Sequence, residues 1–125
     1  MLEKSILTIS GLIFAAYGVA CFLDPALPAA LAGLTIDSGD GFAELGAMYG
    51  GLQFGVGVFC LLCAATPVYT RAGLLLLLLG IGCLALARLF SAWDADWMVG
   101  GYTWGALVFE LLVTGLSALA LKRQA

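Results

Sequence analysis

The chain contains no histidine and few charged residues of either sign. Charged residues make up 10% of its 125 residues, whereas soluble domains carry roughly 25%. Histidine is the commonest general base, metal ligand and proton carrier near neutral pH, so proton chemistry here would need carboxylates, tyrosines or thiols. The acids are scattered, so we expect no zinc or iron site and no bound cofactor.

Basic residues are also scarce, and the net charge is −3. Nucleic-acid binding calls for a basic face, so that class of partner is excluded. The four cysteines lie in or beside apolar segments and do not form a secreted disulfide framework. Cys60 and Cys63 form a C-x-x-C spacing deep in an apolar helix, where poor disulfide geometry favours packing residues over a redox pair. Cys21 and Cys83 are interpreted in the same way.

Hydrophobic residues are abundant, at 63% of the chain. A domain this small cannot bury so many of them in a core, because its surface-to-volume ratio is high. Four apolar segments are long enough, or nearly so, to cross the roughly 30 Å hydrocarbon core of a bilayer. We therefore predict an all-α, four-helix transmembrane bundle in a single domain, residues 1–125, with spans at about 6–23, 42–65, 72–90 and 102–121.

The segment between the first two spans carries several boundary signals. Asp24-Pro25 ends the first helix, because the residue before a proline disfavours the α conformation. Residues 26–34 are too short to span and predict a short helix at the interface. Asp40 is expected to cap the second span. The sequence Ala30-Leu31-Ala32 also fits a signal-peptide cleavage site, although the preceding apolar run is longer than usual and favours a retained helix.

The distribution of charge predicts an orientation. Four basic residues (Lys4, Arg71, Lys122 and Arg123) fall at one side of the predicted membrane, and most acids fall at the other side. The positive-inside rule then places both termini in the cytoplasm. We expect a multi-pass protein of the bacterial inner membrane. Trp93 and Trp97, in the connection before the fourth span, are typical of the membrane–water interface.

Three charged residues, Glu44, Arg88 and Glu110, fall inside predicted spans. Each costs about 2.5–3.5 kcal/mol at the centre of a transmembrane helix, and less toward its ends. All three lie in the outer half, so Arg88 is predicted to pair with Glu110, with Glu44 or with both. Such a cluster is compatible with a functional site and equally with polar contacts that only hold helices together.

The helical faces of two spans support this picture. Thr103, Glu110, Thr114 and Ser117 form one stripe of the fourth span, which should face protein or water. The second span has two faces rich in glycine, which permits close helix approach. This pattern predicts a helix packed on both sides, either centrally in the bundle or against a second copy. The packing glycines are Gly46, Gly50, Gly51, Gly55 and Gly57.

Several of these features together resemble a known family. They are the Asp24-Pro25 pair, the pattern Glu44-x4-Tyr49-Gly50-Gly51, an arginine late in the third span and a glutamate in the fourth. The chain resembles the bacterial membrane proteins called "domain of unknown function 4345" over nearly its whole length. More distantly it is similar to DoxX-type four-helix proteins, some of them linked to quinone or thiol oxidation. The resemblance implies a fold and a polar cluster without a reaction. Family members often carry an arginine where this chain has Leu45-Gly46-Ala47.

The leading functional hypothesis is a polar pocket in the outer half of the membrane. It would bind a lipid-like or quinone-like molecule, or the protein would serve as an accessory subunit to another membrane protein. One alternative is a proton or small-solute transport module in which Glu110 titrates. Another is a structural protein that forms homo-oligomers through its glycine faces. The sequence does not decide whether the protein is an enzyme. The predicted pocket residues are Glu44, Tyr49, Gln53, Arg88 and Glu110.

Overall fold

Four long apolar helices make up most of the chain. The computed structural model describes residues 1–124, and every regular element in that range is helical. The helices long and apolar enough to cross a membrane have 22, 27, 28 and 23 residues. At roughly 1.5 Å per residue, each exceeds the roughly 30 Å hydrocarbon core. The predicted all-α four-helix bundle is therefore confirmed, with spans Leu2–Leu23, Gly39–Ala65, Pro67–Asp94 and Gly101–Arg123.

Two of the spans change helix type along their length. The first span is α1 (Leu2–Leu23) and the fourth is α7 (Gly101–Arg123), both α-helical throughout. The second span comprises α3 (Gly39–Leu45), the π-helical η1 (Gly46–Gly51) and α4 (Leu52–Ala65). The third comprises the 3₁₀ turn η2 (Pro67–Tyr69), α5 (Thr70–Leu76), the π-helical η3 (Leu77–Ile81) and α6 (Gly82–Asp94).

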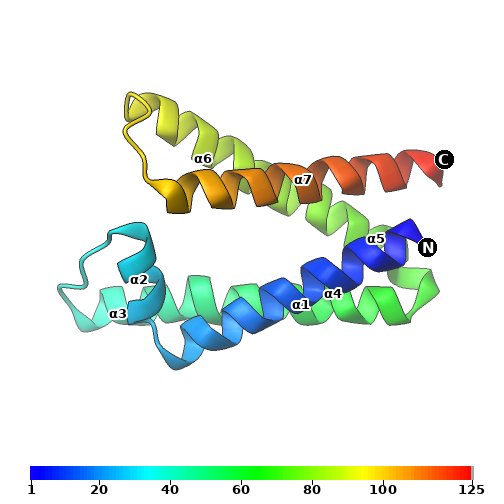
Figure 1. Ribbon diagram of the computed structural model, residues 1–125. Helices are drawn as coiled ribbons and strands as arrows, with labels where there is room; N and C mark the ends of the chain where they lie inside the picture. The colour runs from blue at the N-terminus through cyan, green and yellow to red at the C-terminus, as the bar shows by residue number, and fades with distance from the viewer. Residues whose placement is uncertain (125) are drawn as a thin grey trace.

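The spans form two layers that diverge toward one end (Figure 1). In one layer α1 lies along α4, and in the other α6 lies along α7. The third span starts beside α4 and crosses to the second layer as it proceeds. Both chain termini lie at the end where the layers meet, which we call the terminal end. Two connections, from the first span to the second and from the third to the fourth, lie at the opposite end, the loop end, while the short connection between the second and third spans lies at the terminal end.

Glycines bring α1 and the second span into backbone contact. A Cβ atom added to Gly18 would lie 2.7 Å from Cα of Phe54, and one on Gly50 would lie 2.7 Å from Cα of Phe22. A Cβ on Gly57 would clash in the same way with the backbone of Ala15. This is the close approach that small residues permit between membrane helices.

The other glycine face of the second span has no partner among residues 1–124. A Cβ on Gly51 or Gly55 would meet nothing within 4 Å, while Gly46 lies only near Pro25. Of the two alternatives given for this helix, packing on both sides within a single chain is therefore not seen among the described residues. Both α1 and the third span contact each of the other three spans. Packing of Gly51 and Gly55 against a second copy stays a prediction.

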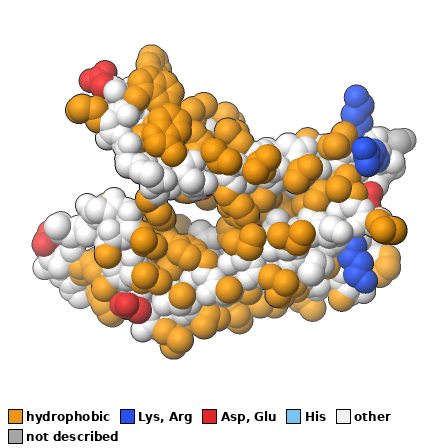
Figure 2. Space-filling model, viewed as in Figure 1, with side chains coloured by type: hydrophobic (Ala, Val, Ile, Leu, Met, Phe, Trp, Pro, Cys, Tyr) orange, Lys and Arg blue, Asp and Glu red, His pale blue; other side chains and the backbone are white. Residues whose placement is uncertain are grey.

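Apolar packing is densest toward the terminal end. Leu7, Leu74, Leu77, Cys60 and Cys63 are fully buried there. Figure 2 shows Lys and Arg side chains gathered at this end and most visible Asp and Glu side chains at the other. The charge asymmetry expected from the sequence is thus present in three dimensions.

The connection between the first two spans differs in one detail from the sequence prediction. The predicted short helix is present as α2 (Ala26–Ala32). The N-cap of α3 is Ser38, whose Oγ accepts a hydrogen bond from the Gly41 amide at 3.1 Å. The assignment of this cap to Asp40 was wrong, because Asp40 already lies in the first helical turn. A carboxylate there still interacts favourably with the helix dipole.

Candidate functional site

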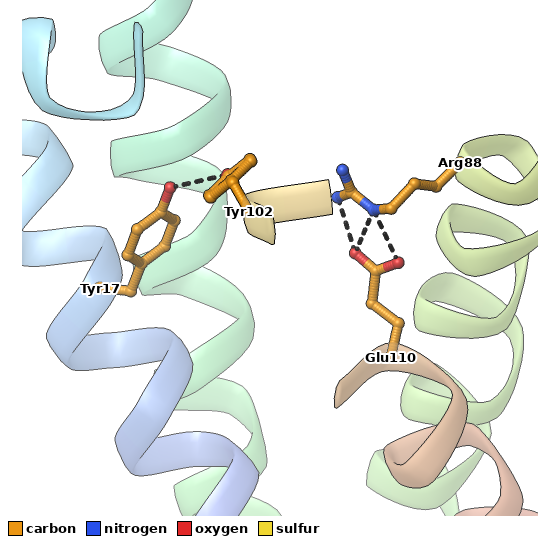
Figure 3. Close-up of polar contacts among 4 residues, drawn as sticks. All are labelled: Tyr17, Arg88, Tyr102 and Glu110. Atoms are coloured by element: carbon orange, nitrogen blue, oxygen red, sulfur yellow. Dashed lines mark hydrogen bonds and ion pairs between the residues drawn. The ribbon is translucent and has the colours of Figure 1, made fainter. Parts of the chain in front are cut away.

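An ion pair joins the third and fourth spans in the loop-end half. Nε of Arg88 lies 3.1 and 3.0 Å from the two carboxylate oxygens of Glu110, and Nη2 lies 2.7 Å from Oε1 (Figure 3). The Glu110 side chain is 6% exposed and that of Arg88 is 23% exposed. A fork of this kind is the strongest protein hydrogen-bond geometry for a carboxylate. The predicted pairing of Arg88 with Glu110 is present.

The pair leaves part of the guanidinium free. An arginine has five N–H donors, and only those on Nε and Nη2 bond to described residues. Nη1 points away from Glu110 (Figure 3). In a span, an N–H without a protein partner needs water or a ligand, because lipid tails offer no acceptor.

A cavity of about 380 Å³ opens beside the pair, between the two layers. Its wall includes Arg88 and Glu110 on one side and residues of α1 and the second span on the other. Most of its exposed lining is apolar, which is usual for sites that take hydrophobic small molecules, and its volume lies within their roughly 300–1,000 Å³ range. Its polar lining residues are Tyr17, Tyr49, Gln53, Arg88, Tyr102 and Glu110.

Two tyrosines close one side of this cavity. The hydroxyl of Tyr17 in α1 lies 3.3 Å from that of Tyr102 at the start of α7 (Figure 3). Among described residues this is the only side-chain hydrogen bond between α1 and the fourth span. One hydroxyl donates to the other, so the second keeps its proton for another acceptor.

Two further cavities meet the first one at the same residues. One of about 530 Å³ lies between the second and third spans, and one of about 350 Å³ opens toward the loop between α6 and α7. Tyr49, Leu84 and Arg88 line all three cavities. Arg88 therefore lies where the three cavities meet. We call the cavity beside the ion pair the chamber and the one between the second and third spans the groove.

The predicted pocket residues do not all converge. Tyr49 and Gln53 line the cavities with Arg88, as the sequence suggested. Glu44 is exposed, lines none of these three cavities and makes no hydrogen bond or ion pair with a described residue. Of the pairings expected for Arg88, the structure contains the one with Glu110 and not the one with Glu44, whose side chain is exposed. The cluster is one carboxylate and one guanidinium.

The polar stripe of the fourth span does face protein. Glu110 and Ser117 are buried, and Thr103 and Thr114 are half-buried. The hydroxyls of Thr114 and Ser117 are buried without a hydrogen-bond partner among described residues.

The cysteines behave mostly as predicted. Cys21, Cys60 and Cys63 are free and buried, so they pack as small apolar residues. Cys83 is free but exposed, and the interpretation of it as a packing residue was wrong. Its side of α6 turns away from the other spans, a direction that helical periodicity alone does not reveal.

Sequence reasoning missed Tyr17 and the two π-helical segments. A lone tyrosine in the first span, among apolar residues, was a usable signal for Tyr17, because its hydroxyl needs a partner in lipid. For the π-helical segments η1 and η3, no sequence pattern used above distinguishes them from α-helix. They become visible only in the backbone hydrogen bonds.

Taken together, the fold and its charge pattern define a small multi-pass membrane protein with a polar site between its helices. A comparison with protein families sharpens this class. The model of a domain of unknown function, DUF4345, matches residues 2–121, so the chain belongs to that family. Searches of curated proteins and of solved structures gave no match. The match covers the first three spans and nearly all of the fourth, including both members of the ion pair.

Proposed function

We propose that this protein binds a hydrophobic small molecule, lipid-like or quinone-like, in the cavity beside Arg88. The observation that carries the proposal is the unfilled donor capacity of Arg88. Glu110 holds the guanidinium in place with three hydrogen bonds, while Nη1 has no partner among the described residues and Arg88 lines a largely apolar cavity. A side chain held in this way is preorganised to bind an oxygen atom of a ligand.

The site supports binding more directly than catalysis. Arg88 orients an oxygen of the ligand, while the Tyr17 and Tyr102 hydroxyls and the Gln53 amide supply further polar contacts. The apolar walls contact the rest of the molecule. The same occupancy suits an accessory subunit that presents a lipid or quinone to a partner membrane protein.

The test is to measure what co-purifies with the protein. Wild type, Arg88→Ala and Arg71→Ala would be extracted in native-membrane discs, and the bound small molecules identified by mass spectrometry. Arg71 is the matched control, because it is exposed at the terminal end and lines none of the three cavities. We expect the Arg88 variant to lose at least about tenfold of one bound species, equivalent to 1.4 kcal/mol.

Equal amounts of every co-purifying species in all three proteins would refute the proposal. Arg88→Ala leaves Glu110 buried without its partner, so the variant could be lost through unfolding instead. The double variant Arg88→Met, Glu110→Leu removes both charges together and controls for this, since replacing a buried pair by apolar residues is often neutral. It should fold and still lack the ligand.

Both termini lie in the cytoplasm in this proposal, with the site in the outer half of the membrane. The support is the charge distribution, since Lys4, Arg71, Lys122 and Arg123 share the terminal end. A reporter that fluoresces only in the cytoplasm, fused to either end of the chain, should be active. Two inactive but expressed fusions would reverse the orientation.

A second candidate function is proton transfer through the fourth span. It is favoured by the buried, unpartnered hydroxyls of Thr114 and Ser117, which follow Glu110 toward the terminal end. Water joining these groups would extend a polar path inward. Proton flux into liposomes should then fall in Glu110→Gln and in Ser117→Ala. Equal flux in wild type, both variants and protein-free liposomes would reject this candidate.

A further inference from the structure

The charge balance at the site restricts the kind of ligand it can hold. Among the residues lining the three cavities, only Arg88 and Glu110 are charged, and they neutralise each other. An anionic headgroup would lie near the Glu110 carboxylate in a medium of low dielectric constant, with no second cation to compensate. A neutral headgroup meets no such penalty.

The hydrogen-bonding groups of the site narrow the class further. Beyond the ion pair, Arg88 still offers N–H groups on Nη1, and the Tyr17–Tyr102 pair retains one hydroxyl proton. Gln53 adds two amide donors and one acceptor. Donors are in excess, so the site suits a ligand that presents acceptor oxygens, such as carbonyl, ester or ether groups.

A groove leads away from this headgroup position along the second and third spans. The cavity of about 530 Å³ shares Tyr49, Gln53, Leu84 and Arg88 with the chamber that contains the ion pair. The rest of its wall is apolar or glycine. It is formed by Met48, Leu52, Val56, Leu76, Gly80 and Ile81.

Both π-helical segments contribute to the wall of this groove. Met48 and Tyr49 belong to η1, and Gly80 and Ile81 belong to η3. A π-helical turn is rare and is often found at functional sites, because it widens the helix and redirects side chains. Two such turns beside one groove are an independent indication that the groove is a built feature of the fold.

We infer that the ligand is a neutral amphiphile with a single long hydrocarbon chain. Its acceptor oxygens bind Arg88, and its chain lies in the groove between η1 and η3, with Gly80 leaving room for it. This inference rests on the proposed function and adds the class of ligand. The chemistry is shared by a monoacyl neutral lipid and by an alkyl quinone.

Photolabelling in a bilayer tests both parts. Three probes would carry the same chain with a diazirine near its end: a monoacylglycerol, an alkyl benzoquinone and the free fatty acid. Each would be irradiated with the protein in phosphatidylcholine nanodiscs, and the labelled residues identified by mass spectrometry. At least one neutral probe should label segments 48–56 and 76–81, and the neutral probe that labels best identifies the source.

The control variants are Gly80→Phe and Gly115→Phe. A Cβ on Gly80 meets only Leu76 at 3.6 Å, and one on Gly115 meets nothing within 4 Å, so both sites accept a side chain. Only the first would fill the groove. We expect groove labelling to fall about tenfold in Gly80→Phe and to be unchanged in Gly115→Phe. The fatty acid should label the groove at most about a tenth as well as the best neutral probe.

Each remaining outcome has a definite meaning. Equal labelling by the fatty acid overturns the neutral headgroup, and labelling spread evenly over all lipid-facing helices overturns the groove. Either result leaves the proposed function intact if Arg88→Ala still loses its co-purifying species. Absence of both specific labelling and any Arg88-dependent species overturns the inference and the proposed function together.

Discussion

The two sides of the second span differ in how closely they approach their neighbours. Toward α1, Gly50 and Gly57 bring backbone against backbone and leave no space. Toward the third span, Tyr49, Gln53 and Leu52 line cavities instead. One helix can therefore pack closely against a neighbour through its small residues and line a cavity with the large side chains of another face.

The largest effect on stability is expected where the second span contacts α1 closely. Gly57→Leu would place side-chain atoms in the backbone of Ala15. We expect a loss of about 4 kcal/mol in the free energy of unfolding, above the usual overpacking cost because a backbone cannot rotate aside. Unfolding in mixed detergent micelles, followed by circular dichroism, measures it. Gly55→Leu is the matched control on the open face, and a loss of equal size there would contradict the prediction.

The ion pair on the cavity side should give the next largest effect. Glu110→Ala leaves the Arg88 guanidinium partly buried without its carboxylate. The expected loss of unfolding free energy is about 3 kcal/mol, the lower end for breaking a buried pair. Combining it with Arg88→Met should restore most of the stability in the same unfolding assay. A double variant as unstable as the single one would show that the pair itself is not the cause.

The hydrogen bond between the layers should matter less. Tyr17→Phe removes the contact of 3.3 Å with Tyr102 while keeping the ring. Interhelical hydrogen bonds in membranes average about 0.6 kcal/mol, so a loss of that size is expected. Tyr69→Phe, at an exposed tyrosine that makes no side-chain hydrogen bond with a described residue, is the control. Identical unfolding curves for wild type and Tyr17→Phe would show that this hydrogen bond does not contribute to stability.

The smallest effect is expected on the open glycine face. Gly51→Leu meets nothing within 4 Å, so the unfolding free energy of the monomer should change by no more than about 0.5 kcal/mol. Any shift in molecular mass between wild type and Gly51→Leu, measured by light scattering in detergent, would then report self-association alone. Gly50→Leu is unsuitable for this purpose, because Gly50 contacts Phe22 within the chain.

Much of the architecture was predictable because the bilayer imposes simple constraints. Four apolar segments had to be helices, since lipid satisfies no backbone hydrogen bond. The buried charges Arg88 and Glu110 were predicted to pair for the same reason. Tyr49 and Gln53 were predicted as pocket residues because they lie in the same half of the membrane as Arg88 and Glu110. These arguments need only helix periodicity, segment length and the cost of an unpaired charge.

Other features depended on which helix faces meet, which a periodic pattern does not specify. Two glycine faces on the second span look equivalent in sequence, yet only one contacts α1. Glu44 was grouped with Arg88 because both were predicted to lie at a similar depth in the membrane. Its side chain is exposed and lines none of the three cavities. The π-helical segments η1 and η3 were not predicted from the sequence.

The sequence by itself determined that this chain forms four membrane-spanning helices with an arginine and a glutamate at matching depth, because lipid excludes unpaired polar groups and rewards long apolar segments. Only the tertiary structure decided that the second span packs against α1 through Gly50 and Gly57, and that Arg88 lines a cavity while its Nη1 has no partner among the described residues. Those outcomes depend on the relative rotation and tilt of the helices. Rotation and tilt are set by the summed packing of all four spans at once.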